Sequence, residues 1–219
     1  MVYMLLGTGF EETEAIAPLD LLRRAGVDIL TVGVTGKTVS DIDMVAVSNG
    51  PGSFTGVRIG VSVAKGIAFP DDLPCMAVST LESMAYNLVL TDCVVCAVMD
   101  ARCNQVYTAT FDCLNGEMKR LTEDEAITID ELTERLKTQD KQIVLIGDGA
   151  NVCYNKMKDE LPNIEIAPLN IRYQSASSVC IIASEMLEKD ENLSISPDEL
   201  LPCYLRLSQA ERELKNKNK

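Results

Sequence analysis

Short apolar runs alternate with segments of helical periodicity along most of this 219-residue chain. The apolar runs predict strands, and inward-facing spacing such as Val179, Ile182, Ala183 and Met186 predicts helices. The expected strands are 43–48, 94–99, 105–112, 142–146 and 164–167, and the expected helices are 129–138 from Asp130, 148–161, and 175–189 from Ser175 or Ser177. Asn115-Gly116 is typical of a hairpin turn. The pattern therefore predicts an α/β protein.

The first 34 residues form a predicted strand–helix–strand unit of their own. Residues 2–6 and 27–34 are apolar runs, and 11–25 has helical spacing that ends before Gly26. About seven residues, 35–41, then precede the next strand, whereas a parallel crossover needs a dozen or more. The two flanking strands are therefore expected to form a hairpin or to belong to different parts of the sheet.

A Gly-rich turn and a helix with a row of small residues follow the strand at 43–48. Gly50, Pro51 and Gly52 break the strand, and Ser53 or Thr55 can cap the new helix. Small residues then recur every fourth position, at Gly56, Gly60, Ala64 and Ala68. Three interpretations stay open: an anion-binding helix start, close packing of the helix on its own sheet, and close packing against another subunit.

Composition and charge narrow the classes of function. A hydrophobic fraction of 47% is typical of a folded protein, and no run of about 18 uncharged apolar residues predicts a membrane span. The start of the chain does not resemble a signal peptide, so we expect a cytoplasmic protein. The net charge of −13 argues against a main RNA-binding surface and favours a basic protein partner. The basic tail at 212–219 is interpreted first as a solvated end.

The residue types that remain offer little catalytic chemistry. The chain has no histidine, which excludes Ser-His-Asp and Cys-His sites. Cys93 and Cys96 lie three apart in a predicted strand, so their thiols should point to opposite faces and the eight cysteines are interpreted as core residues. Asp100 and Asp148 follow predicted strands, where a turn role competes with a catalytic one. Residues 33–38 lack the spacing of a P-loop.

The segment Gly50-Pro-Gly-Ser-Phe-Thr-Gly-x-Arg-x-Gly60 resembles the signature of the TsaB (YeaZ) family. The resemblance covers about residues 38–213 and includes Ala77-Val-Ser-Thr-Leu-Glu82, Asp100-Ala-Arg-Cys-Asn-Gln-Val-Tyr107, Gly147-Asp-Gly149 and the segment that begins at Tyr204-Leu-Arg. It implies a two-lobed fold of the actin-like ATPase (RNase H-like) superfamily. It also implies a non-catalytic role in making threonylcarbamoyladenosine on tRNA, beside a TsaD-like catalytic subunit and a TsaE-like ATPase.

The first 37 residues instead resemble the start of the PfpI/ThiJ family, through Gly9-Phe-Glu-Glu-Thr-Glu-Ala15 and Pro18-Leu-Asp-Leu-Leu-Arg-Arg-Ala-Gly26. Glu14 matches the Glu that assists the Cys nucleophile of that family, but the remainder of that domain is missing. We therefore expect a fusion whose seam lies near Gly36–Val39 and which replaces the first elements of the TsaB-like fold. The expected parts are residues 1–37, a first lobe at 38–92, a second lobe at 93–205 and a basic tail at 206–219.

The resemblance places a partner interface on the Gly-Pro-Gly helix. The expected interface residues are Pro51, Gly52, Ser53, Phe54, Thr55, Gly56, Arg58, Gly60 and Ala64. Phe54 is expected to anchor the contact and Arg58 to make polar contacts at its rim. No cofactor, metal or catalytic residue is expected. The alternatives are a homodimer, ATP binding in an actin-like cleft, and a PfpI/ThiJ-like glyoxalase, deglycase or peptidase activity.

Overall fold

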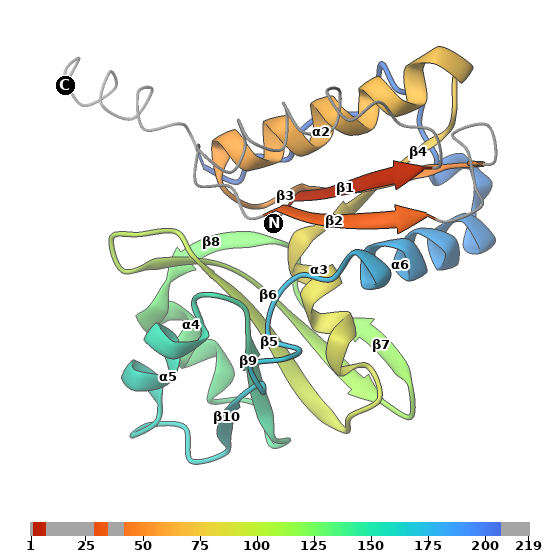
Figure 1. The fold of residues 1–219 in the computed structure, drawn as a ribbon. Coiled ribbons are helices and arrows are strands. Elements are labelled where there is room, and N and C mark those ends of the chain that lie inside the picture. The colour runs from red at the N-terminus through yellow and green to blue at the C-terminus, as the bar shows by residue number, and fades with distance from the viewer. Residues whose placement is uncertain (1, 8–28, 35–41, 207–219) are drawn as a thin grey trace, which may run out of the picture.

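The computed structural model describes residues 2–7, 29–34 and 42–206, and its described strands form three sheets (Figure 1). The strands are β1 (Val2–Gly7), β2 (Ile29–Val34), β3 (Val45–Gly50), β4 (Cys75–Ser79), β5 (Cys93–Asp100), β6 (Gln105–Leu114), β7 (Glu117–Arg120), β8 (Glu125–Thr128), β9 (Ile143–Ile146) and β10 (Ile164–Ile166). The helices are α2 (Phe54–Ala68), α3 (Thr80–Ala85), α4 (Ile129–Leu136), α5 (Ala150–Met157) and α6 (Ala176–Lys189), with 3-10 turns at Phe69–Asp71, Tyr86–Leu88 and Glu191–Leu193. This mixture confirms the α/β class.

The largest sheet has the strand order β10-β9-β5-β6-β7, and β8 also pairs with β6. The central strand β5 runs antiparallel to β6 and parallel to β9, while β10 runs parallel to β9. Asn115 and Gly116 join β6 to β7 with positive φ angles of 55° and 84°, which confirms the predicted hairpin turn.

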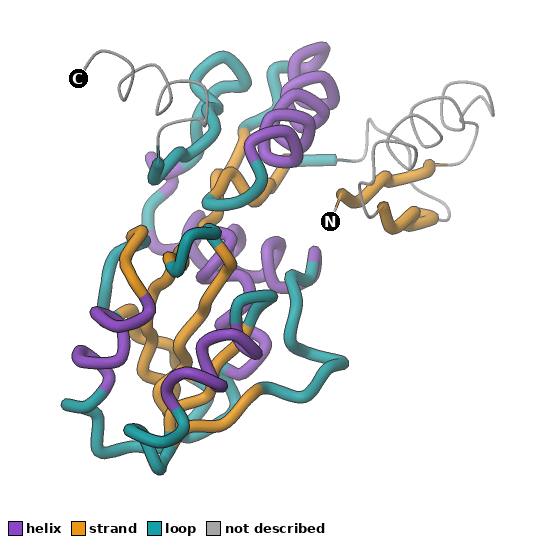
Figure 2. The backbone as a smooth tube through the Cα atoms, turned by 90° about the vertical axis from the view of Figure 1, so that its left-hand side faces the viewer, coloured by secondary structure: helices purple, strands orange, loops and turns teal. Residues whose placement is uncertain are grey.

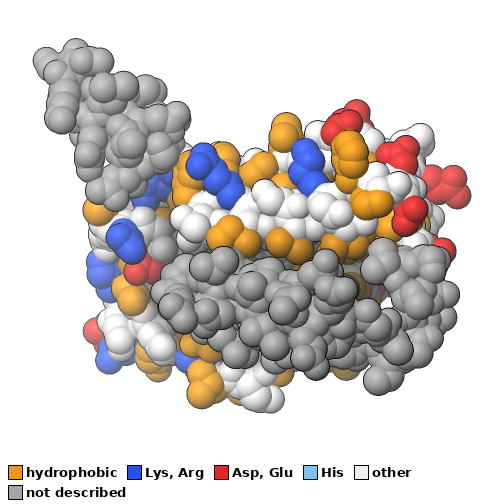
Figure 3. Space-filling view, turned by 45° about the horizontal axis from the view of Figure 1, so that its top comes forward, with side chains coloured by type: hydrophobic (Ala, Val, Ile, Leu, Met, Phe, Trp, Pro, Cys, Tyr) orange, Lys and Arg blue, Asp and Glu red, His pale blue; other side chains and the backbone are white. Residues whose placement is uncertain are grey.

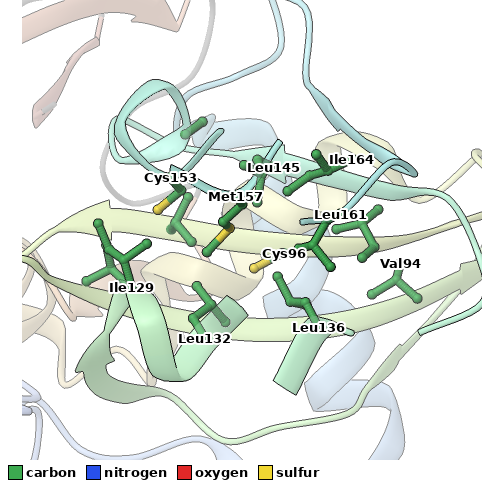
Figure 4. Close-up of a cluster of buried hydrophobic side chains, with 14 of the residues drawn as sticks. Val94, Cys96, Ile129, Leu132, Leu136, Leu145, Cys153, Met157, Leu161 and Ile164 are labelled. Atoms are coloured by element: carbon green, nitrogen blue, oxygen red, sulfur yellow. The ribbon is translucent and has the colours of Figure 1, made fainter. Parts of the chain in front are cut away.

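Helices cover both faces of this sheet. Figure 4 shows one core, in which α4 contributes Ile129, Leu132 and Leu136 and α5 contributes Cys153 and Met157. On the other face, α3 packs its buried leucine and methionine against β5 and β6. The thiol of Cys96 lies in the first core and that of Cys93 in the second, as the period of two in a strand predicted. Burial raises the pKa of Cys96 to about 12, which suits an unreactive core residue.

A second sheet consists of β3 and β4, which run parallel. Helix α2 packs on one face of this pair and α6 on the other. Within the described residues β3 pairs only with β4, so the opposite edge of β3 has no strand beside it there.

The remaining strands, β1 and β2, pair in parallel with each other, Val2 opposite Ile29, and with no other described strand. Figure 2 shows them to one side of β3 and α2. The two predicted strands at the start of the chain are therefore present. The described strands β2 and β3 belong to separate sheets, whereas a hairpin or two parts of one sheet was expected. The predicted helix at 11–25, Glu14 and the seam at 36–39 lie outside the described residues.

Three helices differ from the sequence expectation in a boundary or in a cap. Helix α4 is capped by Thr128, whose hydroxyl accepts from the Glu131 N–H at 3.1 Å, so Asp130 lies inside the helix. Helix α5 begins at Ala150 rather than at 148, and the Asp148 carboxylate accepts from the Asp100 N–H; the helix ends at Met157 rather than at 161. Ser175 stands at the start of α6 without a capping bond, because its hydroxyl bonds to that of Ser177 instead.

Candidate partner interface

Helix α2 starts from a tightly constrained turn at the end of β3. Gly50 has φ of +133°, and a Cβ atom there would lie 2.3 Å from the carbonyl oxygen of Cys203. Only glycine fits this position without moving the backbone. Ser53 then caps the helix, its hydroxyl accepting from the Gly56 N–H at 3.4 Å, which confirms the predicted cap. The turn therefore sets where the helix begins and brings a segment from the end of the chain against it.

The faces of α2 differ in what covers them. One face, the core face, is buried against the β3–β4 sheet and consists of Val57, Val61, Ala64 and Ala68. The groove face consists of Gly56, Gly60, Val63 and Ile67, which are partly or fully exposed. The ridge consists of exposed positions Thr55, Ser62, Gly66 and Phe69. Figure 3 shows hydrophobic and basic side chains along this helix.

Small residues at every fourth position suggest a single helix face, but in the structure the row does not stay on one face. Four residues advance a helix by about 400°, so each step of four rotates the row by about 40°. Gly56 and Gly60 therefore lie on the groove face, whereas Ala64 and Ala68 have turned into the core of their own lobe, 5% and 0% exposed. Ala64 and Ala68 therefore fit the interpretation that the helix packs closely on its own sheet. Gly56 and Gly60 remain partly exposed.

A groove of about 290 Å³ runs beside the groove face. Its other walls are β3 and the start of α6, and Met99 at the end of β5 lines it as well. A Cβ atom added at Gly60 would lie 4.0 Å from the nearest atom of Val47, an ordinary contact distance. At this glycine the groove therefore has room for at least a methyl group.

Residues 198–206, the C-terminal strap, run along the opposite side of α2. The Lys65 ammonium donates to the carbonyl oxygens of Asp198 at 3.2 Å and Leu200 at 3.3 Å. The Cys203 N–H donates to the Asn49 carbonyl at 2.7 Å, and the Asn49 amide donates to the Leu201 carbonyl at 3.2 Å. Leu200 of the strap is fully buried in the core between α2 and the β3–β4 sheet. These bonds make the strap part of the same surface as α2.

An aromatic pair joins the strap to the first turn of α2. The rings of Phe54 and Tyr204 are stacked, with centroids 4.1 Å apart and planes 1° from parallel. The Arg58 guanidinium lies 4.9 Å from the Phe54 ring centroid and donates through Nε to the Tyr204 hydroxyl at 2.7 Å. Further along, Arg206 donates to the Ala101 carbonyl, which ties the strap to the larger sheet.

The structure places the nine predicted interface residues in three environments. Pro51 and Ala64 are buried, Gly52, Phe54, Gly56 and Gly60 are partly buried, and Ser53, Thr55 and Arg58 are exposed. Phe54 already stacks against Tyr204, so it presents part of its ring rather than a free side chain. That these residues meet a partner stays a prediction. Tyr204 and Leu201 were not expected at this surface, because nothing local in the sequence relates them to α2.

The two aspartates at strand ends both serve the backbone. The Asp100 carboxylate accepts from the Arg102 N–H at 2.7 Å, and the Asp148 carboxylate accepts from the Asp100 N–H at 3.2 Å. Burial raises the pKa of Asp148, and backbone N–H groups partly oppose that rise. Within the described residues no cluster of three or more His, Cys, Asp or Glu side chains is arranged to hold a metal ion. The bonds at Asp100 and Asp148 fit the turn role.

Known proteins resemble this chain over most of its length. The family model of TsaD, tRNA N6-adenosine threonylcarbamoyltransferase, matches residues 32–214. The tRNA threonylcarbamoyladenosine biosynthesis protein TsaB of Bacillus subtilis is 31% identical over 171 residues, 78% of this chain and 72% of that protein. This chain belongs to the TsaB family. The TsaB protein of Escherichia coli is 30% identical over 210 residues, 94% of this chain and 86% of that protein.

Resemblance to TsaD proteins themselves is more local. The tRNA N6-adenosine threonylcarbamoyltransferase of Rhodospirillum rubrum is 44% identical, but only over 63 residues, 29% of this chain and 17% of that protein. Of these individual relatives, the TsaB proteins of Bacillus subtilis and Escherichia coli match over the larger share of this chain. Two solved structures, YeaZ from Pseudomonas aeruginosa and an uncharacterized protein with similarity to peptidase YeaZ from the same organism, share the fold. Each has a TM-score of 0.65 and covers 94% of this chain, at 24% and 23% identity respectively.

These structures and the family match support the predicted actin-like, RNase H-like fold class. Among the described helices, none is both long enough and apolar enough to cross a bilayer.

Proposed function

We propose that this chain is a non-catalytic scaffold subunit in the cytoplasmic synthesis of threonylcarbamoyladenosine on tRNA, and that it pairs through α2 with a TsaD-like catalytic subunit. The family relationship supports the pathway. The observation that carries the pairing is the groove face of α2, where Gly56 and Gly60 leave backbone accessible beside an apolar groove. Small residues on a helix let a partner helix approach closely and bury apolar surface.

In this proposal the scaffold carries no chemistry of its own. A TsaE-like ATPase completes the assembly, and tRNA is bound chiefly by other subunits because this chain has a net charge of −13. A homodimer through the same face is the competing arrangement, since one helix face cannot serve two partners at once. Mass measurements on mixtures distinguish the two.

The first 37 residues are a separate part of the proposal. The parallel pair β1–β2, unpaired with other described strands, supports a fused strand–helix–strand fragment of the PfpI/ThiJ type. The match to the Escherichia coli protein covers 94% of this chain, so it extends into this fragment as well. A PfpI/ThiJ-like activity would need a thiol beside Glu14, and that residue lies outside the described part of the chain.

Gly60→Leu tests the pairing. We expect at least a roughly 100-fold loss of affinity for the TsaD-like subunit, because a leucine side chain fills the groove that the partner would enter. The monomer should stay folded, because leucine favours the helix by about 1 kcal/mol over glycine. Co-purification and calorimetry measure the loss.

Asn151→Leu is the matched control, since it adds an exposed leucine on α5, away from the groove. It should pair like the unaltered chain. Undiminished pairing of folded Gly60→Leu would rule out the groove face as the contact.

A further inference from the structure

We propose that the docking surface for the TsaD-like partner is composite: α2 supplies one part, and the C-terminal strap supplies Leu201 and Tyr204, with Arg58 directed at a carboxylate of the partner. This inference rests on the proposed function and adds to it the residues and the chemistry of the contact. It assigns a role to the strap, which the sequence analysis left without one.

The first support is the way in which the strap is held. It is bonded to Asn49 before α2 and to Lys65 in the last turn of α2, and it stacks on Phe54 at the start of the helix. A partner that covers the exposed ridge of α2 therefore meets the strap on one side and the groove on the other. The strap's position is fixed before binding, so little ordering entropy is lost on contact.

The second support is the pattern of exposure along the strap. Leu200 is fully buried in the core between α2 and the β3–β4 sheet, whereas the next residue, Leu201, is 65% exposed. Tyr204 is 39% exposed although its ring is stacked. A large apolar side chain and an aromatic one thus stand uncovered beside α2. Tyrosine and arginine at the centre of a patch are the residues that most often carry binding energy.

The third support is the charge of Arg58. In a chain of net charge −13, this exposed arginine forms no ion pair among the described residues. Four other basic residues, Arg120, Arg135, Lys137 and Lys141, are each paired with two carboxylates. Lys65 and Arg172 also lack an ion pair among the described residues, but they donate to backbone carbonyls of this chain. The Tyr204 hydroxyl accepts a hydrogen bond from Arg58 Nε, and this bond orients the guanidinium. The positive charge of the guanidinium can then attract a negatively charged group of the partner. A carboxylate on the partner is the complement.

Tyr204→Ala tests the composite surface directly. We expect about 30-fold weaker binding of the full-length variant to the purified TsaD-like subunit, measured by calorimetry. Tyr204→Phe keeps the stack and loses the bond to Arg58, so we expect about a 5-fold loss. Tyr173→Ala is the control, because Tyr173 is 40% exposed, almost the same as Tyr204, and lies outside the strap. Its affinity should stay within about 2-fold of the unaltered chain.

Arg58→Met tests whether a carboxylate of the partner binds Arg58. Binding of the unaltered chain should weaken as salt rises, and this variant should bind more weakly with a flatter salt dependence. It also serves if Tyr204→Ala does not fold. Failure of the unaltered chain to bind a TsaD-like subunit refutes the proposed function itself. Two results would refute only the composite surface, provided that the unaltered chain binds. One is a Tyr204→Ala variant that binds as tightly as the unaltered chain, and the other is an Arg58→Met variant with the same salt dependence as the unaltered chain.

Discussion

Gly147→Ala is expected to destabilise the protein by about 4 kcal/mol. Gly147 follows β9 with φ of +110°, and a Cβ atom there would lie 2.2 Å from the Val98 carbonyl oxygen of the central strand. That overlap involves backbone, so relief requires β5 and β9 to separate. The Gly147 N–H also donates to the Arg172 carbonyl at 2.9 Å, which would be disturbed as well.

Gly116→Ala is the control for the backbone angle alone. Gly116 has φ of +84°, but a Cβ atom there would lie 3.6 Å from its nearest neighbour, an ordinary contact. It should therefore cost about 1 kcal/mol, the usual strain of a left-handed alanine. Denaturant melts of both variants give the comparison. Equal stability of the two variants would show that the contact with Val98 does not constrain the sheet.

Arg120→Met is expected to destabilise the protein by about 3 kcal/mol. The Arg120 guanidinium bonds to Glu82 of α3 and to Asp124, each at 2.6 Å, and lies 4.7 Å from the Phe111 ring centroid. Ser79, which caps α3, donates to the same aspartate at 2.5 Å. This cluster joins the small sheet to the edge of the large one. Methionine keeps the packing over the ring but leaves two carboxylates unpaired in a partly buried site.

Arg135→Met is the matched control, because Arg135 also bonds to two carboxylates, Glu125 and Glu131. Its side chain is 43% exposed against 24% for Arg120, so we expect a loss of less than about 1 kcal/mol. Urea melts at low and high salt measure both. If Arg120→Met cost no more than Arg135→Met, the cluster would contribute nothing to joining the two sheets.

Sequence patterns predicted those strands and turns that are determined by residues close together in the chain. The apolar runs located β5, β6 and β9, and the period of two placed Cys93 and Cys96 in opposite cores. Asn115-Gly116 determined its own turn, because the residue types allow the positive φ that the turn needs. The first residue of α4 was predicted correctly, but its cap was wrong by two residues, because both Thr128 and Asp130 are able to cap and only the fold selects between them.

Only part of the candidate surface, helix α2, could be predicted from the sequence. The motif around Gly56 and Gly60 pointed to α2, yet the rotation of the small-residue row into the core depends on where the sheet lies. The strap could not be predicted at all. Its contacts with Arg58 and Asn49 join residues 146 and 152 positions apart, and no periodicity connects segments at such separation. Three-dimensional structure is what brings Tyr204 to Phe54.

The most direct test of the pairing is the native mass of this chain mixed with a TsaD-like subunit, measured by light scattering at micromolar concentration. We expect one species with the summed mass of one copy of each protein. Two unassociated species, or a homodimer of this chain that persists while the TsaD-like subunit stays free, would contradict the account.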